Sequence, residues 1–509
     1  MFLINKFIKL KFKSRYKEIE KFKNNPQTAQ AEVFLDLIKK SKDTIWGERY
    51  NYSKIAAKDF NLALADFQSS VPISSYEKLY SDIERVVLGE ENILWPGKNK
   101  WLAKSSGTTN SKSKLIPITK ESLKKCHYQG GEDVIALYLK SNPISKLFSG
   151  KTLSVGGSFV GKKHSNDSSC GDLSAILIHN LPLWAKIFRA PRLSTALLGD
   201  WEVKIDMIAK EAIKRNITAL AGVPSWTLVV LNRVLEMTGK DNISQVWPNL
   251  ELFIHGGVSF APYKEQFKKI IPNPKMNYFE TYNASEGFFA LNEKAGDDDM
   301  LLVLDSGVFY EFIPLTELDQ EKPQALDVSR VELGKTYALA ISTNGGLWRY
   351  LIGDTVTITS LKPLKIKVAG RTKHFINVFG EELMVSNTDE ALRLVSEKTG
   401  IMVLDYTVAP IFMENSNQGG HEWLIEFSNP PEDINIFITE LDTALKSLNS
   451  DYEAKRFNDM ILLPPKINIA RSGLFYDWLK SKGKLGGQNK VPRLSNSRDY
   501  LEELLKVEY

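Results

Sequence analysis

The sequence has few cysteines and few histidines, and it contains no long hydrophobic run. Two of its 509 residues are cysteines, Cys126 and Cys170, and six are histidines. Neither cysteine belongs to a Cys-x-x-Cys pair, so we do not expect a structural zinc site. A large chain with so few cysteines is typical of the cytoplasm, and we expect both thiols to behave as small buried hydrophobic groups.

No stretch of the chain has the apolar length that a membrane-spanning helix requires, so we predict no integral membrane segment. Residues 1–23 combine many lysines with spaced apolar residues. They lack the continuous apolar core and the small-residue cleavage site of a signal peptide. Such a segment either lies on an anionic membrane surface as a basic amphipathic helix or docks its apolar stripe on the main domain. We favour docking.

The charge balance argues against a nucleic-acid partner. The formal net charge is +5, with 43% hydrophobic and 25% charged residues, which is ordinary for a globular protein. No basic stripe is interleaved with aromatic residues. A small positive charge suits a protein that handles anionic small molecules.

The length predicts two or three domains, and a monomer is the default expectation.

The order of the predicted elements indicates an α/β fold. Residues 1–95 are mainly helical, and residues 100–355 alternate strands and helices, which predicts a parallel or mixed sheet covered on both faces. Residues 301–360 lose the helices and resemble an antiparallel meander or distorted barrel. We therefore expect a large N-terminal α/β domain over 1–365, with mixed sheets and a barrel-like β portion, and a small C-terminal α+β lid over 366–509.

The first candidate site is a hydroxyl-rich segment with flanking lysines, Ser105–Lys114. Its hydroxyls, its backbone N–H groups at a glycine and its lysine ammonium groups could converge on phosphate oxygens. It is not a Walker A loop, because the closing Gly-Lys-Ser/Thr is absent. The predicted phosphate-binding residues are Ser105, Ser106, Gly107, Thr108 and Thr109, with Lys114 supplying positive charge. The alternative is a solvated surface loop.

The second candidate site is Tyr282–Glu286, directly after a predicted buried strand. Ligand crevices commonly form at the carboxyl ends of strands. Tyr282 offers an aromatic face to adenine, and Glu286 offers a hard oxygen ligand to Mg²⁺. The alternative is a capped turn in which Ser285 starts a helix and Tyr282 lies in the core.

The third candidate site is Trp348–Asp354, where Asp354 follows a glycine turn. A carboxylate at such a position can accept hydrogen bonds from both ribose hydroxyls. The alternative is an ordinary turn with Arg349 in a surface ion pair. In the C-terminal loop, Lys490 would stabilise charge on an α-phosphate if a mobile lid carried it to the site. Otherwise it is a solvated loop lysine.

Together these segments resemble the adenylate-forming enzymes, and specifically the acyl acid amido synthetases of the Gretchen Hagen (auxin-responsive) family. Ser105–Lys114, Tyr282–Glu286 and Tyr350–Asp354 are similar to the three family motifs. Two residues depart from the pattern. Ser111 stands where relatives usually carry glycine, and Leu351 stands where the family carries arginine. Gly370-Arg371-Thr-Lys373 is similar to the hinge segment of the wider superfamily.

The resemblance implies a two-step reaction that uses ATP and Mg²⁺. A carboxylic acid is activated as acyl-AMP with release of pyrophosphate, and the acyl group is then transferred to the amine of an amino acid. It implies that Lys490, Glu286 and Lys114 are catalytic, that Glu286 holds the metal, and that Ser285 and Arg371 contact the nucleotide. Rotation of the lid would let one site serve both steps.

Two other functions stay open at this point. A carboxylate–CoA ligase shares the first half-reaction and differs only in the nucleophile. A non-catalytic nucleotide-binding protein is the second alternative, although it would not need a mobile charge such as Lys490. The identity of the acid and of the amine acceptor is not readable from the sequence.

Overall fold

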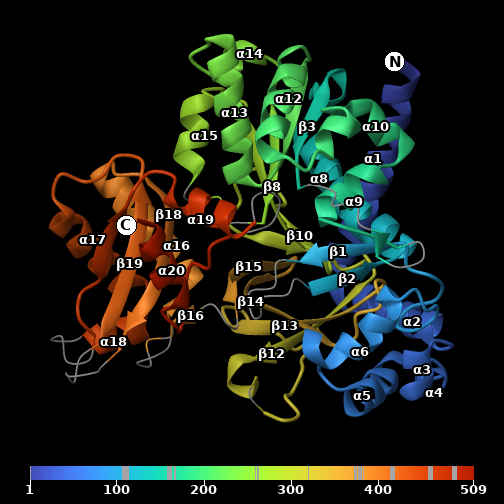
Figure 1. Ribbon diagram of the computed structural model, residues 1–509. Coiled ribbons are helices and arrows are strands. Elements are labelled where there is room, and N and C mark those ends of the chain that lie inside the picture. Colours follow the sequence, from blue (N-terminus) through green and yellow to red (C-terminus); the bar gives the residue numbers. More distant parts are fainter. Residues whose placement is uncertain are drawn as a thin grey trace.

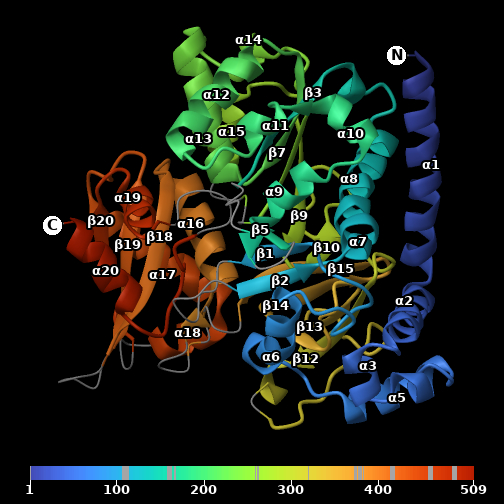
Figure 2. The ribbon, with the colours of Figure 1, turned by 45° about the vertical axis from the view of Figure 1, so that its right-hand side comes forward.

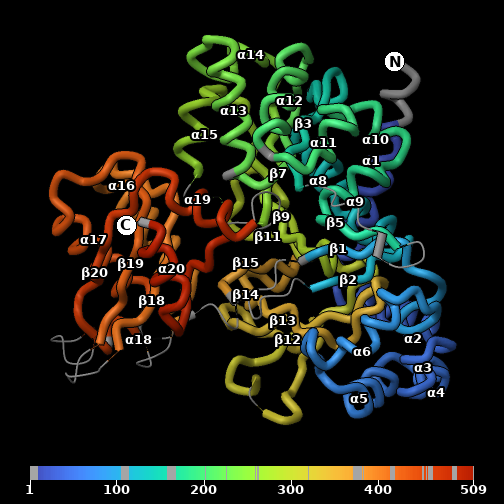
Figure 3. The backbone as a smooth tube through the Cα atoms, in the orientation of Figure 1, coloured from blue at the N-terminus to red at the C-terminus, as the bar shows by residue number. Residues whose placement is uncertain are grey.

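The computed structural model describes residues 2–105, 114–157, 163–164, 168–257, 260, 263–318, 320–371, 375–376, 381, 383–412, 419–456, 462–483 and 490–508. Helices and strands are mixed throughout, and a smaller C-terminal unit lies beside a large body (Figure 1). The chain path in Figure 3 runs from the blue helices near the N-terminus through the large body to this red and orange unit.

One sheet of eleven strands organises the large body, in the order β12-β13-β14-β15-β11-β10-β9-β8-β7-β3-β6. Five neighbouring strands are parallel: β6 (Arg189–Ala190), β3 (Lys151–Val155), β7 (Ile217–Gly222), β8 (Leu252–Gly256) and β9 (Asn277–Ala284). The others are antiparallel: β10 (Gly287–Leu291), β11 (Met300–Leu302), β15 (Leu364–Arg371), β14 (Tyr350–Leu361), β13 (Thr336–Thr343) and β12 (Val308–Pro314). The predicted mixed α/β fold is confirmed, and the β-rich portion forms the antiparallel half of this sheet.

The parallel strands are buried on both faces, which explains their nearly continuous apolar sequences. Successive residues point to opposite faces. Ala219 and Leu252 belong to a hydrophobic cluster with one set of helices, while Leu220 and Phe253 belong to a second cluster with the other set. The first set includes α8 (Tyr128–Ser141) and α9 (Leu173–His179); the second includes α12 (Trp201–Ile213), α13 (Pro224–Thr238), α14 (Ile243–Val246) and α15 (Lys264–Ile270).

The N-terminal helix α1 (Phe2–Asn24) packs along α8, as Figure 2 shows. Phe12 and Ile19 are buried in the main hydrophobic cluster, and Arg15 pairs with Asp133 of α8. Docking, the favoured alternative for this segment, is therefore what the structure shows. Among the described residues, no helix is both long enough and apolar enough to cross a membrane.

Further short helices lead from α1 to a second, smaller sheet. They are α2 (Pro26–Ser41), α3 (Ile45–Arg49), α4 (Tyr52–Ile55), α5 (Phe60–Ser70) and α6 (Tyr76–Val87). The small sheet has the order β2-β1-β5-β4, from β2 (Lys114–Ile118), β1 (Trp101–Ser105), β5 (Ser168–Gly171) and β4 (Lys163–His164). Short elements complete the body: α7 (Lys120–Ser122), η1 (Leu123–His127), η2 (Leu147–Ser149), α10 (Leu183–Phe188), α11 (Leu193–Ala196) and η4 (Leu315–Glu317).

The C-terminal unit has its own sheet and its own cores. Its strands pair in the order β18-β19-β20, and β19 is buried along its whole length. The elements are β16 (Phe375–Ile376), β17 (Leu383–Met384), α16 (Val385–Thr399), β18 (Val403–Ile411), β19 (Gly420–Phe427), α17 (Ile434–Leu448), α18 (Ser450–Arg456), β20 (Lys466–Ala470), α19 (Leu474–Ser481) and α20 (Asp499–Glu508). One core lies under α16 and α17 and another under α19 and α20. We call this unit the lid; the exact boundary after residue 365 stays a prediction, and β15 continues in the main sheet to Arg371.

The two cysteines differ in their surroundings. Cys126 is 1% exposed, as expected for a small hydrophobic residue, whereas Cys170 is only partly buried. Burial raises the pKa of the Cys126 thiol to about 12, so the thiol stays protonated at neutral pH.

Candidate functional site

The second and third candidate sites meet at the carboxyl end of β9. The Tyr282 hydroxyl donates a hydrogen bond of 2.7 Å to Asp354 Oδ2 on β14, and both side chains are buried. In the strand order, β10, β11 and β15 separate these two strands, so the sheet must curl to bring them together. Asp354 also lies opposite Arg371 in the pairing of β14 with β15. Residues 72 positions apart in sequence thus form one contact.

A tight turn after Tyr282 holds Ser285 and Glu286. It joins β9 to the antiparallel strand β10, so Ser285 does not start a helix and that part of the alternative is wrong, whereas Tyr282 does lie in the main hydrophobic cluster, as the alternative expects. Both residues are buried, at 2% and 9% exposure. Within the described part of the chain, Ser285 Oγ has no hydrogen-bond partner. A buried hydroxyl in this state is destabilising unless a ligand satisfies it.

The end of β8 brings backbone from the main sheet close to the lid. Gly257 follows β8 with φ of +83°, a left-handed conformation that favours glycine. A Cβ atom built on it would lie 3.5 Å from Val223 Cγ2 and 4.0 Å from Lys490 Nζ. The lysine singled out in the C-terminal loop therefore reaches the carboxyl edge of the parallel strands. Ligands of open α/β sheets bind at this edge.

His255, one residue before the two glycines, is part of the core. Its ring stacks on Phe260 with 4.0 Å between ring centroids, and the side chain is 3% exposed. Burial lowers the pKa of His255 to about 3, so the imidazole is neutral.

The first candidate site is the segment between β1 and β2, two strands that pair with each other antiparallel. Ser105 pairs with Lys114 at the last described register position. Ser106, Gly107, Thr108 and Thr109 lie outside the described residues, as do Ser111, Lys112, Lys373 and the side chain of Arg371. The Lys114 ammonium lies 5.5 Å from the ring centroid of Tyr76, whose hydroxyl accepts a hydrogen bond from the Leu115 N–H.

Arg349 does not form the surface ion pair of the alternative interpretation, because its partner is fully buried. Its Nε and Nη2 donate to the two carboxylate oxygens of Glu311 at 2.9 and 3.0 Å, and its Nη1 donates to the Val71 carbonyl at 2.7 Å. Arg349 is 4% exposed, Glu311 is 0% exposed, and Arg349 adopts φ of +42°. This clamp ties the segment after α5 to β12 and fixes the start of β14. Sequence reasoning missed it.

Leu351, which departs from the family pattern, also helps to fix β14. Its N–H donates to the Ser74 carbonyl at 2.9 Å, and the Ser74 N–H donates to the Arg349 carbonyl at 2.9 Å. The Leu351 side chain packs on a small cluster that includes Ile313 and Ala340.

A buried lysine that the sequence did not reveal supports the end of β3. Lys204 of α12 is 0% exposed, and its ammonium donates to the carbonyls of Gly156 and Gly157 at 2.8 and 2.9 Å. Burial lowers the pKa of Lys204 to about 8, while the nearby Asp172 carboxylate opposes this change. A lysine on an amphipathic helix usually extends into solvent, so only the paired glycines after β3 hinted at this contact.

Charged groups also meet between the main sheet and the lid. Burial raises the pKa of Glu280 on β9 to about 7; Lys367 lowers it, and Asp389 of the lid raises it further. Elsewhere between the two units, Lys480 pairs with Glu202 at 2.7 Å and the Tyr476 ring lies 6.3 Å from the Trp226 ring. Lid and main domain thus contact each other at several points.

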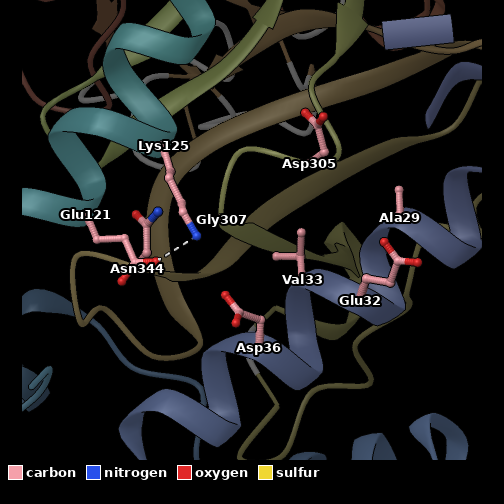
Figure 4. Close-up of a pocket in the computed structure, with 9 residues that line it drawn as sticks. All are labelled: Ala29, Glu32, Val33, Asp36, Glu121, Lys125, Asp305, Gly307 and Asn344. Carbon is pink, nitrogen blue, oxygen red and sulfur yellow. Dashed lines mark ion pairs between the residues drawn. The ribbon is translucent and has the colours of Figure 1, made fainter. Parts of the chain in front are cut away.

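A cavity of about 180 Å³ lies elsewhere, between α2 and the turn before β12 (Figure 4). Three of its four carboxylates, Asp36, Glu121 and Asp305, pair with lysine or arginine side chains of this chain. None of its lining residues belongs to the candidate site, so we do not assign it to the nucleotide.

Comparison with protein families gives matches over most of the chain. Residues 15–276 match the GH3 family N-terminal domain, residues 301–371 its central domain and residues 386–499 its C-terminal domain.

Known proteins of Arabidopsis thaliana are similar at low identity. Indole-3-acetic acid-amido synthetase GH3.3 is 23% identical, with 96% of this chain and 92% of that protein covered. 4-substituted benzoates-glutamate ligase GH3.12 is 21% identical, with 96% of both covered.

Among solved structures, the GH3.15 acyl acid amido synthetase in complex with 2,4-DB superposes with a TM-score of 0.79 at 17% identity, covering 98% of this chain and 96% of that chain. A 2-hydroxyisobutyryl-CoA ligase superposes with a TM-score of 0.57 at 12% identity, covering 95% and 92%. These likenesses establish the fold.

Proposed function

The chain belongs to the GH3 family, and we propose that it is an ATP-dependent acyl acid amido synthetase. In the proposed first step, a carboxylate oxygen attacks the α-phosphorus of ATP, and acyl-AMP forms as pyrophosphate leaves. In the second, the amine of an amino acid attacks the acyl carbonyl, and AMP leaves. The observation that carries the proposal is the meeting of Tyr282, Asp354, Gly257 and Lys490 at one edge of the sheet.

The nucleoside is assigned to the contact between β9 and β14. Asp354 would accept the ribose hydroxyls, and the hydrogen bond from Tyr282 orients its carboxylate. The Tyr282 ring would border adenine. Ser285 supports this assignment, because its buried hydroxyl lacks a partner and a ligand group would supply one. Arg371, opposite Asp354 in the strand pairing, is assigned to the same nucleotide.

The phosphates are assigned to the space between the β1–β2 hairpin and Gly257. Residues Ser105, Ser106, Gly107, Thr108 and Thr109 would bind phosphate oxygens through hydroxyl and N–H groups, with Lys114 nearby. The Lys490 ammonium would stabilise the charge that develops on the α-phosphate during acyl-AMP formation. Its position beside Gly257 supports that role.

Glu286 is the residue assigned to Mg²⁺. Mg²⁺ often uses one or two carboxylates together with substrate phosphates. Among the described residues no group of three metal-binding side chains occurs, and a single buried carboxylate at the turn fits a metal shared with ATP. When bound, Mg²⁺ would neutralise phosphate charge.

We assign an amino acid as the acceptor of the second step, because relatives in the GH3 family are amido synthetases. The fold also occurs in a CoA ligase, which keeps a thiol acceptor as the second candidate. Water must be excluded while the amine is held near the carbonyl, since hydrolysis of acyl-AMP competes. The low cysteine count supports a cytoplasmic location.

Pyrophosphate release tests the proposal. The protein is incubated with ATP, Mg²⁺ and aryl, indolyl or fatty acids, each alone, with pooled amino acids, or with CoA, and products are identified by mass spectrometry. An acyl-amino acid establishes the proposed function, and an acyl-CoA replaces it with the ligase. If no acid leads to pyrophosphate release although the protein binds ATP, the result supports a non-catalytic nucleotide-binding protein.

A matched pair of variants links the activity to the site. Lys490→Ala should reduce pyrophosphate release at least about a hundredfold, as loss of a charge-stabilising donor does. Lys506→Ala, an exposed lysine on the last helix of the lid, should change it by less than about twofold.

A further inference from the structure

The cavity between α2 and the turn before β12 is lined by a buried side chain whose hydrogen-bonding groups are unused. Asn344 is 2% exposed, and neither its Oδ1 nor its Nδ2 has a hydrogen-bond partner among the described residues. Burial of such an amide is destabilising, because its hydrogen bonds to water are lost and not replaced. A ligand in the cavity that both donates and accepts would satisfy the two atoms.

The backbone around Asn344 fixes the amide at the cavity wall (Figure 4). The Asn344 N–H donates to the Gly307 carbonyl at 2.9 Å, and the Asn344 carbonyl accepts from Thr119 Oγ1 at 2.7 Å. A Cβ atom built on Gly307, where φ is +72°, would lie 2.2 Å from Asn344 Nδ2. The amide therefore packs directly on the glycine backbone, and a larger residue at position 307 would collide with it.

Carboxylates make up most of the remaining polar wall. Four of them line the cavity together with one ammonium group, that of Lys125. Glu32 is exposed on α2 and forms no ion pair with another described residue. The Lys125 side chain is 53% exposed and lies 3.3 Å from Glu121, so it can turn into solvent. An excess of carboxylates favours a cationic ligand.

The cations that pair with the other carboxylates are shared. Lys40 contacts Asp36 at 2.5 Å and Glu121 at 2.6 Å. Arg15 contacts Asp305 at 2.6 Å and also pairs with a second carboxylate on α8. One positive group serves two carboxylates in each case, which leaves negative charge uncompensated at the cavity.

The size of the cavity limits the ligand. Its volume is about 180 Å³, and an engineered cavity of about 150 Å³ holds benzene, so a molecule of roughly six to eight heavy atoms fits. Over the part of the chain that the structure describes, no three acidic, histidine or cysteine side chains are grouped as a metal ion would require. An organic cation is therefore favoured over a metal ion.

We propose that this cavity binds a small amino alcohol, with its hydroxyl on the Asn344 amide and its ammonium group on the carboxylates of α2. A hydroxyl can donate to Oδ1 and accept from Nδ2, which satisfies both atoms of the amide. The ammonium group has three donors to share between Glu32 and Asp36. The site is separate from the one assigned to the nucleotide, and its occupation does not depend on the proposed function.

Calorimetric titration of the full chain with 4-amino-1-butanol, at low ionic strength and without ATP, tests the proposal. One saturable site is expected, with a Kd of about 1 mM or below, which ligands of this size can reach. Butylamine lacks the hydroxyl and 1,4-butanediol lacks the charge, and each should bind roughly three- to tenfold more weakly. Absence of saturable binding, or equal binding of the three compounds, would overturn the proposal.

The variant Asn344→Leu assigns the hydroxyl to the amide. It removes both polar atoms and keeps a similar volume. The affinity for 4-amino-1-butanol should fall to that for butylamine, while the affinity for butylamine itself should stay within about twofold of wild type. If both compounds lose affinity equally, the amide does not recognise the hydroxyl and the proposal is wrong.

Two exposed positions test the charges, and they remain informative if Asn344→Leu folds poorly. Glu32→Gln should weaken binding of 4-amino-1-butanol roughly two- to threefold, and Lys125→Met, which removes a lining cation, should strengthen it by a similar factor. General damage to the fold cannot produce opposite signs. Glu432→Gln, an exposed carboxylate of the lid, is the matched control and should leave the Kd unchanged. If Glu32→Gln and Lys125→Met also leave it unchanged, the cation does not bind in this cavity.

Discussion

Replacing Arg349 by methionine is expected to lower the free energy of unfolding by about 3–5 kcal/mol, the range for removing one partner of a buried ion pair. Glu311, at 0% exposure, would keep its negative charge without the guanidinium that now binds both of its oxygens. The Val71 carbonyl would also lose a donor. Methionine fills much of the same volume, so loss of packing contributes little.

Denaturant unfolding measures the effect. Trp348, next in sequence and 0% exposed, donates its indole N–H to the Leu94 carbonyl and should change its fluorescence when the main domain unfolds. The midpoint should fall while the slope with denaturant stays the same, because the surface exposed on unfolding is unchanged.

Two controls make the result specific. The double variant Arg349→Met, Glu311→Met should recover most of the loss, because no unpaired buried charge remains. Arg330→Met breaks a pair with Asp327 in which the arginine is 43% exposed, and should lose less than about 1 kcal/mol. If Arg349→Met unfolds within 1 kcal/mol of wild type, this pair does not hold the start of β14.

Three more predictions follow from single contacts. Tyr282→Phe removes the hydrogen bond to Asp354 and should raise the KM for ATP roughly tenfold in the pyrophosphate assay; an unchanged KM would separate the contact from the nucleotide. The pKa of Lys204 is lowered, so wild-type stability should fall relative to Lys204→Met by up to roughly 3 kcal/mol as pH drops from 10.5 towards 8, measured by thermal unfolding at each pH; a constant difference would contradict it. The pKa of Glu280 is raised, so wild type should lose stability relative to Glu280→Gln as pH rises from 4.5 through 7; parallel pH curves would argue against its burial.

Much of the architecture follows from patterns within short windows of sequence. Apolar runs such as that of β7, alternating with helices, predict a parallel sheet buried on both faces, and the structure has it. The sequence also directs attention to Tyr282 and Asp354 separately, because each follows a strand or a glycine turn. What local pattern cannot supply is their mutual hydrogen bond, which depends on the curl of the sheet across β10, β11 and β15.

The buried charged residues are the main feature of the structure that the sequence analysis did not predict. They can be recognised in the sequence by their position beside buried residues of a strand. Glu311 lies in β12, where all other residues up to Ile313 are buried apolar groups, and Glu280 directly follows the buried Phe279 in β9. A charged residue inside such a run must be desolvated, so it requires a partner or a shifted pKa. Glu311 has the partner, and Glu280 has the shifted pKa.

The same reasoning distinguishes the charges that shape the site from those that serve the reaction. Arg349 and Lys204 direct their donors to carboxylate or backbone oxygens of their own chain, at the start of β14 and after β3. Lys490 instead is exposed and faces a glycine at the sheet edge. A buried, satisfied charge resists movement, whereas an exposed one on a separate unit can be delivered and withdrawn. The fixed charges thus lie at the ends of strands of the main sheet, whereas the lysine assigned to the reaction is carried by the lid.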